Sequence, residues 1–236
     1  MHGKIYIIPT TIGDVCIGDT IPQRTIDVMR NIRHFIVEDV RTARRYLSKA
    51  GMPVKIDELA FFELNEHTKA DEIPQLLAPA LQGFDMGIIS EAGVPCVADP
   101  GAAAVAYAHS KNIRVVPLVG ASSILLAVMA AGMNGQNFAF AGYLPVKEQQ
   151  RCQHIQFLEK RSKQENQTQI FIETPYRNMQ LLKSFFSVCN SSTMLCIAAN
   201  ITLADEFIKT MSIADWKKNI PDINKKPCIF ILQGTC

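Results

Sequence analysis

The first half of the chain alternates short apolar runs with longer segments of helical spacing. Continuous apolar runs are typical of strands that are buried on both faces of a parallel sheet. The predicted strands of this half are residues 5–8, 34–37, 59–64, 86–89 and 114–119. The segments between them predict helices over residues 25–31, 41–50, 71–82 and 102–112. Regular strand–helix alternation of this kind predicts a mostly parallel sheet in an α/β domain.

The pattern changes after Gly135, because the predicted strands then follow one another at shorter spacings. They are residues 138–143, 170–173, 194–199, 206–209 and 226–233, with helices over 148–163, 178–189 and 215–219. Short connections favour a mixed sheet. We therefore predict two α/β domains, an N-terminal one (1–117) with a mostly parallel sheet and a C-terminal one (118–236) with a mixed sheet. A ligand cleft is expected between them, near the turn at residues 121–123.

Composition narrows the possible partners. The chain has 236 residues, 48% of them hydrophobic, and a formal net charge of +2. It is therefore long enough for a substantial core, but it lacks the strong positive charge of a protein that binds nucleic acid over its whole surface. Seven cysteines form no CxxC pair and have no histidine at zinc spacing, so we expect a reduced, cytoplasmic protein without a bound metal.

No stretch of the sequence predicts a membrane anchor. The chain opens directly into a strand, without a signal peptide. Residues 115–133 carry no charge, but Pro117, Gly120 and Ser122 interrupt them, which favours a buried strand, a turn and a buried helix that Ser122 would cap. The motifs GxGxxG, GxxxxGK[ST], GxSxG and HExxH are all absent, which excludes the common nucleotide-binding and hydrolase templates.

Residues 87–101, GIISEAGVPCVADPG, are the most distinctive loop of the sequence. A strand, a long loop rich in Gly and Pro, and a helix are how an α/β protein builds a ligand site at the carboxyl end of a strand. We interpret this loop as backbone that wraps around a ligand. The alternative is a simple strand–helix connection, although such connections usually have only about 2–6 residues.

Polar side chains follow several of the predicted strands. Glu38, Asp39 and Arg41 come directly after the second strand, where they could orient a substrate or move a proton. Alternatively, Asp39 caps the arginine-rich helix and Glu38 pairs with an arginine. The segment 65–67 (Asn-Glu-His) occupies a similar position, although a lone histidine is more often a surface residue. Lys147 and Arg151 could attract phosphate or simply form a solvated helix face.

Six segments together resemble the tetrapyrrole (corrin/porphyrin) methylase superfamily. They are PTTIGD, VEDVRTARRYL, SEAGVPCVADPG, VPLVGASSILLAVMAAGM, FAFAGYLPVK and IFIETPYRN, in that order. The resemblance extends from about residue 4 to residue 236 and is strongest to the branch of small-subunit ribosomal RNA (cytidine-2′-O)-methyltransferases. It implies two α/β domains that hold S-adenosylmethionine (SAM) between them, largely through backbone groups, in a protein that is usually a homodimer.

The resemblance also implies roles for individual residues. The positions expected to face substrate are Glu38, Asp39, Arg41, Glu66 and Lys147. The positions expected to bind the cofactor are Pro9, Gly13, Ser90, Gly93, Val94, Ala121, Ser122, Ser123, Pro175, Ala199 and Asn200. Two segments depart from the family pattern: SDAGTP is SEAGVP at residues 90–95, and the charges of RELTK are missing after Ala199.

Methyl transfer from SAM is an in-line displacement that mainly requires alignment of the nucleophile with the methyl group. We therefore predict a SAM-dependent methyltransferase for a ribose 2′-hydroxyl of small-subunit ribosomal RNA, with Asp39 or Glu38 as the base. One alternative is a methyltransferase for a tetrapyrrole or another small molecule, which a deep apolar trough would favour over an open, positive cleft. The other is a SAM-binding protein without catalysis, which the missing RELTK charges would favour.

Overall fold

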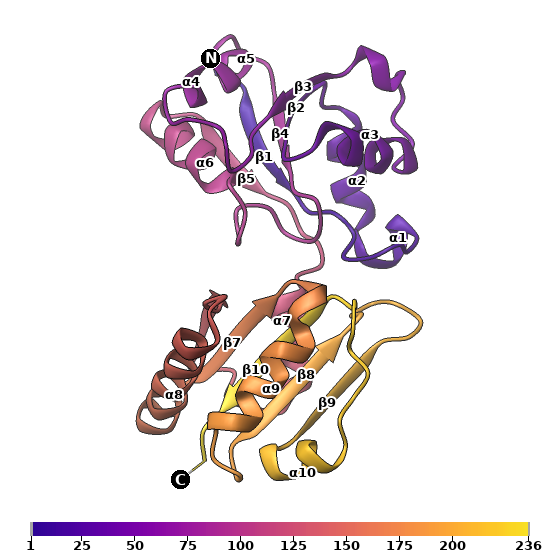
Figure 1. Ribbon diagram of the computed structural model, residues 1–236. Coiled ribbons are helices and arrows are strands. Elements are labelled where there is room, and N and C mark those ends of the chain that lie inside the picture. The colour runs from indigo at the N-terminus through magenta and orange to yellow at the C-terminus, as the bar shows by residue number, and fades with distance from the viewer. Residues whose placement is uncertain (1, 236) are drawn as a thin grey trace. The chain divides into compact units, whose positions relative to one another are not determined.

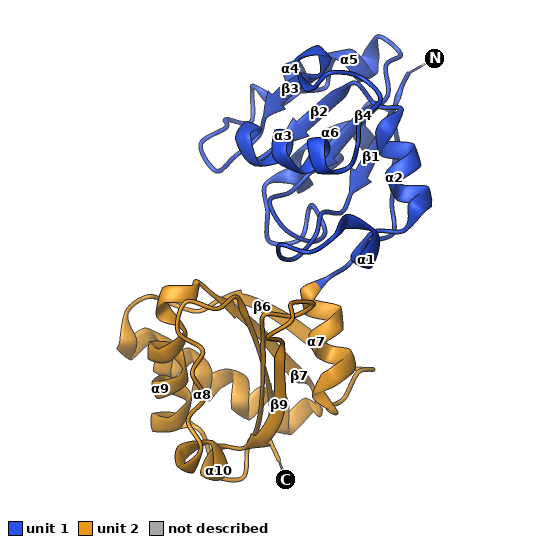
Figure 2. Ribbon diagram, turned by 90° about the vertical axis from the view of Figure 1, so that its right-hand side faces the viewer, with its two compact units in different colours: residues 1–122 blue, residues 123–236 orange. Residues whose placement is uncertain are grey.

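The computed structural model describes residues 2–235 and divides into two compact units, unit 1 (residues 1–122) and unit 2 (residues 123–236) (Figures 1 and 2). Each unit has its own five-stranded sheet with helices on both faces. The predicted fold class, two α/β domains with one parallel and one mixed sheet, is confirmed. No helix in the described part of the chain is both long and apolar enough to cross a membrane.

The sheet of unit 1 is entirely parallel, with the strand order β3-β2-β4-β1-β5. Its strands are β1 (Lys4–Ile8), β2 (His34–Val37), β3 (Ala60–Glu63), β4 (Met86–Ile89) and β5 (Arg114–Pro117). Successive strands first step outward from β1 to β3, and the chain then returns through β4 to β5. Because parallel crossovers are right-handed, this reversal of direction places the helices on both faces of the sheet.

Two sets of helices cover these faces (Figure 1). The first set is α1 (Ile17–Thr20), α2 (Gln23–Arg30) and α3 (Val40–Lys49); the second is α4 (Ile73–Leu76), α5 (Ala78–Leu81) and α6 (Gly101–Ser110). Phe35 packs with the first set, and its neighbour Ile36 packs with the second. A short 3-10 helix, Ile56–Glu58, precedes β3. Alternation along β2 thus serves both cores, which explains its continuous apolar run.

The prediction of one helix over residues 71–82 is wrong. Two single-turn helices, α4 and α5, occupy this segment and meet at Leu77, whose ψ of 6° is not helical. The cause is Pro79, which has no backbone N–H and whose ring collides with the preceding turn. Pro74 fits a first helical turn, but a second proline in the same segment starts a new helix.

Unit 2 contains a mixed sheet with the order β6-β7-β10-β8-β9. Its elements are α7 (Ser123–Ala131), β6 (Phe138–Tyr143), α8 (Glu148–Glu165), β7 (Thr168–Glu173), η2 (Pro175–Arg177), α9 (Asn178–Val188), β8 (Met194–Ala199), β9 (Phe207–Ser212), α10 (Ile213–Lys218) and β10 (Cys228–Gln233). Helices α8, α9 and α10 cover one face around Phe185 and Trp216, whereas α7 packs on the other through Ala127 (Figure 2). Strands β6, β7 and β8 run in one direction, and β9 and β10 run in the other.

Candidate functional site

The loop after β1 is fixed from two sides within unit 1. The backbone N–H of Thr10 donates to the carbonyl oxygen of Gly93 (2.8 Å), and the buried hydroxyl of Tyr46 donates to the carbonyl oxygen of Pro9 (2.9 Å). Tyr46 belongs to α3, and Gly93 lies in the long loop after β4. The loops that follow β1 and β4 are thus held together as one rigid surface at the carboxyl edge of the sheet, which we call the wall. It lies where the strand order reverses, which is where open α/β sheets bind their ligands.

Two glycines allow the backbone of this wall to pack closely. A Cβ atom on Gly120 would lie 2.3 Å from Cβ of Pro9, so no larger residue fits there without movement. Gly93 has φ +75°, and a Cβ atom there would lie 3.6 Å from the carbonyl oxygen of Ala121. The structure therefore brings together Pro9, Gly93 and Ala121, three residues for which the family resemblance implies cofactor binding.

One polar atom in this wall is left without a partner. The side chain of Thr10 is only 2% exposed, and its Oγ1 forms no hydrogen bond with any described residue. Ser90, at the end of β4, is 8% exposed, and its hydroxyl makes only long contacts, 3.4 and 3.5 Å, with carbonyl oxygens of its own loop. A buried hydroxyl without a hydrogen bond calls for a partner that the chain does not provide.

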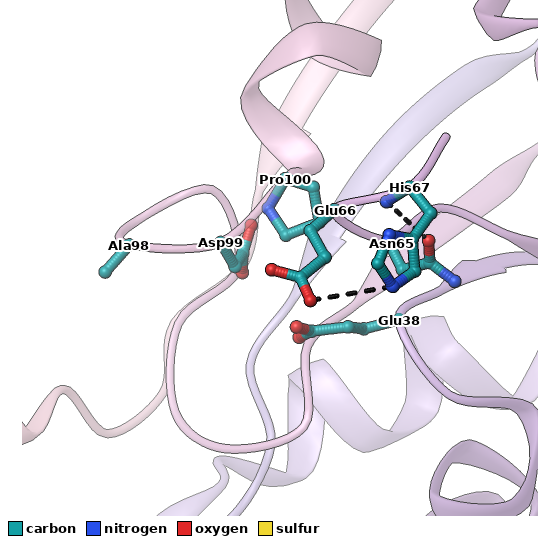
Figure 3. A pocket seen from close by; sticks show the side chains of 7 residues that line it. All are labelled: Glu38, Asn65, Glu66, His67, Ala98, Asp99 and Pro100. Carbon is teal, nitrogen blue, oxygen red and sulfur yellow. Dashed lines mark hydrogen bonds and ion pairs between the residues drawn. The ribbon is translucent and has the colours of Figure 1, made fainter. Parts of the chain in front are cut away.

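A pocket of about 510 Å³ opens beside this wall, at the carboxyl ends of β2, β3 and β4 (Figure 3). Three loops of unit 1 line it with residues Glu38, Asn65, Glu66, His67, Ala98, Asp99 and Pro100. The carboxylates of Glu38, Glu66 and Asp99 are turned toward one another in Figure 3. The pocket is thus markedly acidic, although no group of three or more His, Cys, Asp or Glu within residues 2–235 is arranged to hold a metal ion.

Short-range bonds hold the loops of the pocket in place. Asn65 Oδ1 accepts the backbone N–H of His67 (2.9 Å), and His67 Nε2 lies 3.6 Å from Glu66 Oε1. Asp99 Oδ1 accepts the backbone N–H groups of both Cys96 and Gly101 at 2.8 Å. Asp99 therefore braces the segment between β4 and α6, where Cys96 has a φ of +68°.

Electrostatics distinguish the two acids that follow β2. Desolvation raises the pKa of Glu38, and the negative charges of Glu91 and Asp99 raise it further. Asp39 instead caps α3: its carboxylate accepts the backbone N–H of Thr42 (2.7 Å), and these hydrogen bonds lower its pKa. The structure thus shows the capping alternative for Asp39. Glu38 forms no ion pair with an arginine anywhere in residues 2–235.

In unit 2, three residues expected at the cofactor lie at one edge of the sheet. The backbone N–H of Lys225 donates to the carbonyl oxygen of Pro175 (3.1 Å), and that of Asn200 donates to the carbonyl oxygen of Pro227 (3.0 Å). Ala199 pairs with Cys228, the first residue of β10. Pro175, Ala199 and Asn200 thus all border the segment that enters β10.

The same edge carries the loop after β6, in which Lys147 is exposed. Arg151, however, is only 5% exposed. Its Nε donates to Ser184 Oγ (2.9 Å) and one of its terminal nitrogens to the carbonyl oxygen of Val146 (2.7 Å). The suggestion that Arg151 attracts phosphate is therefore wrong, because its guanidinium is buried and braces this loop.

Sequence reasoning noted the segment 65–67 but assigned a site role only to its Glu66, and it did not include Asp99 among the site residues. Asp99 lies nine residues beyond Ser90, and only the folding of its loop returns it to the pocket. The available signal was that three strands of one parallel sheet are each followed by a loop with an acidic side chain. The carboxyl ends of such strands lie at the same edge.

No protein-family model matches this chain. It is 30% identical over 233 residues to a Vibrio cholerae serotype O1 protein named ribosomal RNA small subunit methyltransferase I, covering 98% of this chain and 77% of that protein. A protein of the same name from Escherichia coli O157:H7 is 28% identical over 236 residues, covering 99% and 78%.

Solved structures with the same fold include the methyltransferase CobJ, with a TM-score of 0.65 and 14% identity over 99% of this chain and 95% of that one. The cobalt precorrin-4 methyltransferase CbiF has a TM-score of 0.62 and 15% identity, covering 98% and 94%. At these identities the likeness shows the fold, whereas the relationship to the Vibrio protein shows the family. The chain is a methyltransferase with the tetrapyrrole-methylase fold and belongs to the ribosomal RNA small subunit methyltransferase I family.

Proposed function

We propose that this protein transfers a methyl group from SAM to a ribose 2′-hydroxyl of small-subunit ribosomal RNA. The observation that carries the proposal is the match, over 98% of this chain, to the Vibrio cholerae protein named ribosomal RNA small subunit methyltransferase I. The polar pocket beside the wall of Pro9, Gly93 and Ala121 supports it, because a sugar hydroxyl is a suitable group for such a pocket.

The residues of unit 1 fit a cofactor that is held by backbone groups. Thr10 provides a buried, unpartnered hydroxyl, and the close packing of Gly120 on Pro9 leaves a wall of peptide groups. The proposed cofactor residues are Pro9, Gly13, Ser90, Gly93, Val94, Ala121 and Ser122 in unit 1 and Ser123, Pro175, Ala199 and Asn200 in unit 2. A uroporphyrin-III C-methyl transferase of this fold was solved with S-adenosyl homocysteine (TM-score 0.59).

When bound, SAM supplies an electrophilic methyl group, and the remaining work is alignment and proton removal. Glu38 is the better base of the two acids that follow β2. Its raised pKa makes the carboxylate a stronger base, whereas the carboxylate of Asp39 is engaged as the cap of α3. In this proposal a carboxylate oxygen of Glu38 accepts the proton of the 2′-hydroxyl. Asp39 holds the first turn of α3 and so positions Glu38.

The proposed contacts to substrate are Arg41, Glu66 and Lys147. Arg41 and Lys147 are exposed cations at the carboxyl edges of their respective sheets. Glu66 lines the pocket with Glu38 and can accept a hydrogen bond from a sugar hydroxyl or a base amino group. The same carboxylates argue against a tetrapyrrole substrate, because such molecules carry carboxylates of their own and would be repelled.

We further propose that the protein acts in the cytoplasm as a homodimer. The six cysteines in the described part of the chain are all free, which suits a reducing compartment. Unit 2 exposes Met129 (79%) on α7 and Phe138 (39%) on β6, apolar surface of a kind that subunit contacts cover. Sedimentation equilibrium should give twice the monomer mass of 26.2 kDa, and a single monomeric species would reject the dimer.

The test of the main proposal is methyl transfer to small ribosomal subunits from a strain that lacks this gene. With methyl-labelled SAM, we expect label in the small-subunit RNA, at a nucleotide that resists alkaline cleavage because its 2′-oxygen is methylated. Binding of SAM without any transfer to small subunits would instead support the non-catalytic alternative. An unchanged ribose methylation pattern in the deletion strain would reject the substrate.

A further inference from the structure

Helix α3 carries four cationic side chains, which the structure divides into two pairs. Arg44 forms an ion pair with Asp57 and lies over the ring of Phe61, 5.9 Å from its centroid. Lys49 Nζ lies 2.6 Å from Asp14 Oδ1. These two cations already have anionic partners within unit 1.

The other two cations, Arg41 and Arg45, are exposed and form no ion pair within residues 2–235. They are spaced i, i+4, so both lie on one face of α3, separated by one helical turn of about 5.4 Å. The residues between and beside them that face the core are Ala43 and Tyr46, which are buried. The exposed face of α3 thus presents two arginines in a row.

The position of this pair relative to the pocket follows from the chain. Helix α3 begins at Val40, directly after Glu38 and Asp39, so its first turn with Arg41 lies at the carboxyl edge of the sheet. Arg45 lies one turn further from that edge. The pocket itself carries the carboxylates of Glu38, Glu66 and Asp99 and therefore repels phosphate.

We propose that Arg41 and Arg45 bind two neighbouring phosphates of the RNA strand and keep its backbone on α3 while the sugar of the target nucleotide enters the acidic pocket. This inference rests on the proposed function and adds Arg45 to the substrate contacts. Phosphate contacts of this kind position a strand without reading its sequence. The division of charge explains how an acidic pocket can belong to an RNA enzyme.

The test compares three single substitutions that each remove one exposed positive charge from unit 1. They are Arg41→Gln, Arg45→Gln and the control Arg114→Gln, which lies at the first residue of β5, at the opposite edge of the sheet. The dissociation constant of an unmodified small-subunit RNA transcript is measured over a range of salt concentrations with S-adenosylhomocysteine present. Thermal melting of each variant confirms folding.

For Arg45→Gln we expect about three- to tenfold weaker binding near 0.1 M salt, and a salt-dependence slope that is lower by about 0.7, the value for one phosphate contact of a single strand. Arg41→Gln should lower the slope by a similar amount, and Arg114→Gln should match the wild type in both affinity and slope. In methyl transfer, Arg45→Gln should raise KM for RNA and leave kcat within about twofold, because the residue does not touch the reacting atoms.

Each outcome decides a different claim. If Arg45→Gln has the slope and affinity of Arg114→Gln while the wild type methylates its RNA, the phosphate contact is overturned and the proposed function stands. If the wild type binds the transcript and small subunits but methylates neither, the proposed function is overturned, and the slopes alone decide the contact. A wild-type protein that binds no RNA rejects both.

Discussion

The two units have five-stranded sheets with helices on both faces, yet the edges that carry the proposed site differ in charge. In unit 1 the carboxyl edge holds a pocket with three carboxylates. In unit 2 the corresponding edge is mixed in charge: it presents exposed Lys147 and Lys225, the exposed acids Asp205 and Glu206, and an exposed aromatic ring, Tyr176 (76%). Unit 1 contains twelve Lys and Arg against fourteen Asp and Glu, whereas unit 2 contains twelve against eight.

This difference shows why the net charge of +2 says little about the substrate. The charge is the sum of one acidic and one basic unit, whose opposite signs partly cancel. An anionic strand can be attracted by one part of the chain while another part accepts a neutral sugar. Local charge, set by the loops at each sheet edge, determines which chemical group is bound where.

The units also build their edges differently. In unit 1, a fully parallel sheet, every polar group of the edge follows a strand. In unit 2 the antiparallel strand β10 begins at the edge, so the segment before it, with Lys225 and Pro227, forms part of the edge. A mixed sheet therefore recruits residues that precede a strand, which an inspection of strand ends alone would miss.

The largest expected effect would show that the acidic edge is the reacting one. Glu38→Gln removes the proposed base and should lower kcat by about 10²- to 10⁴-fold, the usual contribution of a general base, with little change in RNA affinity. The matched control is Glu58→Gln, an exposed glutamate of the same unit. Single-turnover methyl transfer measures the effect, and equal rates for both variants would exclude Glu38 as the base.

A second substitution tests the rigid wall of unit 1. Gly120→Ala places a Cβ atom 2.3 Å from Cβ of Pro9, and we expect it to destabilise unit 1 by about 1–3 kcal/mol through overpacking. Gly135→Ala in unit 2, where the added Cβ atom would lie 4.0 Å from a methyl carbon of Val128, serves as the control. Urea denaturation followed by hydrogen exchange should locate the loss in unit 1. A free energy of unfolding equal to that of the control variant would contradict the close packing of Gly120 on Pro9.

The brace in unit 2 provides the third test. Arg151→Met leaves the carbonyl oxygen of Val146 and the hydroxyl of Ser184 without this donor, at an expected cost of about 1–3 kcal/mol. Lys160→Met, on the exposed side of the same helix, is the matched control. Differential scanning calorimetry compares the two. If Arg151→Met weakens RNA binding but leaves stability unchanged, the bracing role is wrong.

The smallest effect concerns pH. The pKa of Glu38 is raised first by desolvation and then by Glu91, so the basic form is lost, and kcat falls, as pH drops through a value above the ordinary glutamate range. Glu91→Gln removes the second cause and should move this acid limb to lower pH. The pH profile of kcat for wild type and Glu91→Gln measures the shift. If the acid limb of Glu91→Gln stays in place or moves to higher pH, the limb does not report the titration of Glu38.

Much of the fold was predictable because β1, β2 and β4 are continuously apolar and the segments between them have helical spacing. The failure at residues 71–82 came from Pro79, whose local effect outweighs the apolar periodicity. In the site, the sequence identified Glu38 and Glu66 by their places after strands. It left open which of Glu38 and Asp39 is free, because the two are adjacent and differ only in what they contact.

The sequence by itself determined the order of the elements, the two kinds of sheet and the family, since periodicity and ordered motifs are properties of the chain. The structure decided for the local cap of α3 at Asp39, which the sequence had left as one of two alternatives. Only the tertiary structure buried Arg151 and brought Asp99 to Glu38. The same holds for the four cations of α3: within residues 2–235, Arg44 and Lys49 form ion pairs, whereas Arg41 and Arg45 do not. Burial, pairing and pKa depend on neighbours that are distant in sequence, and these exist only once the sheet has set the strand ends side by side.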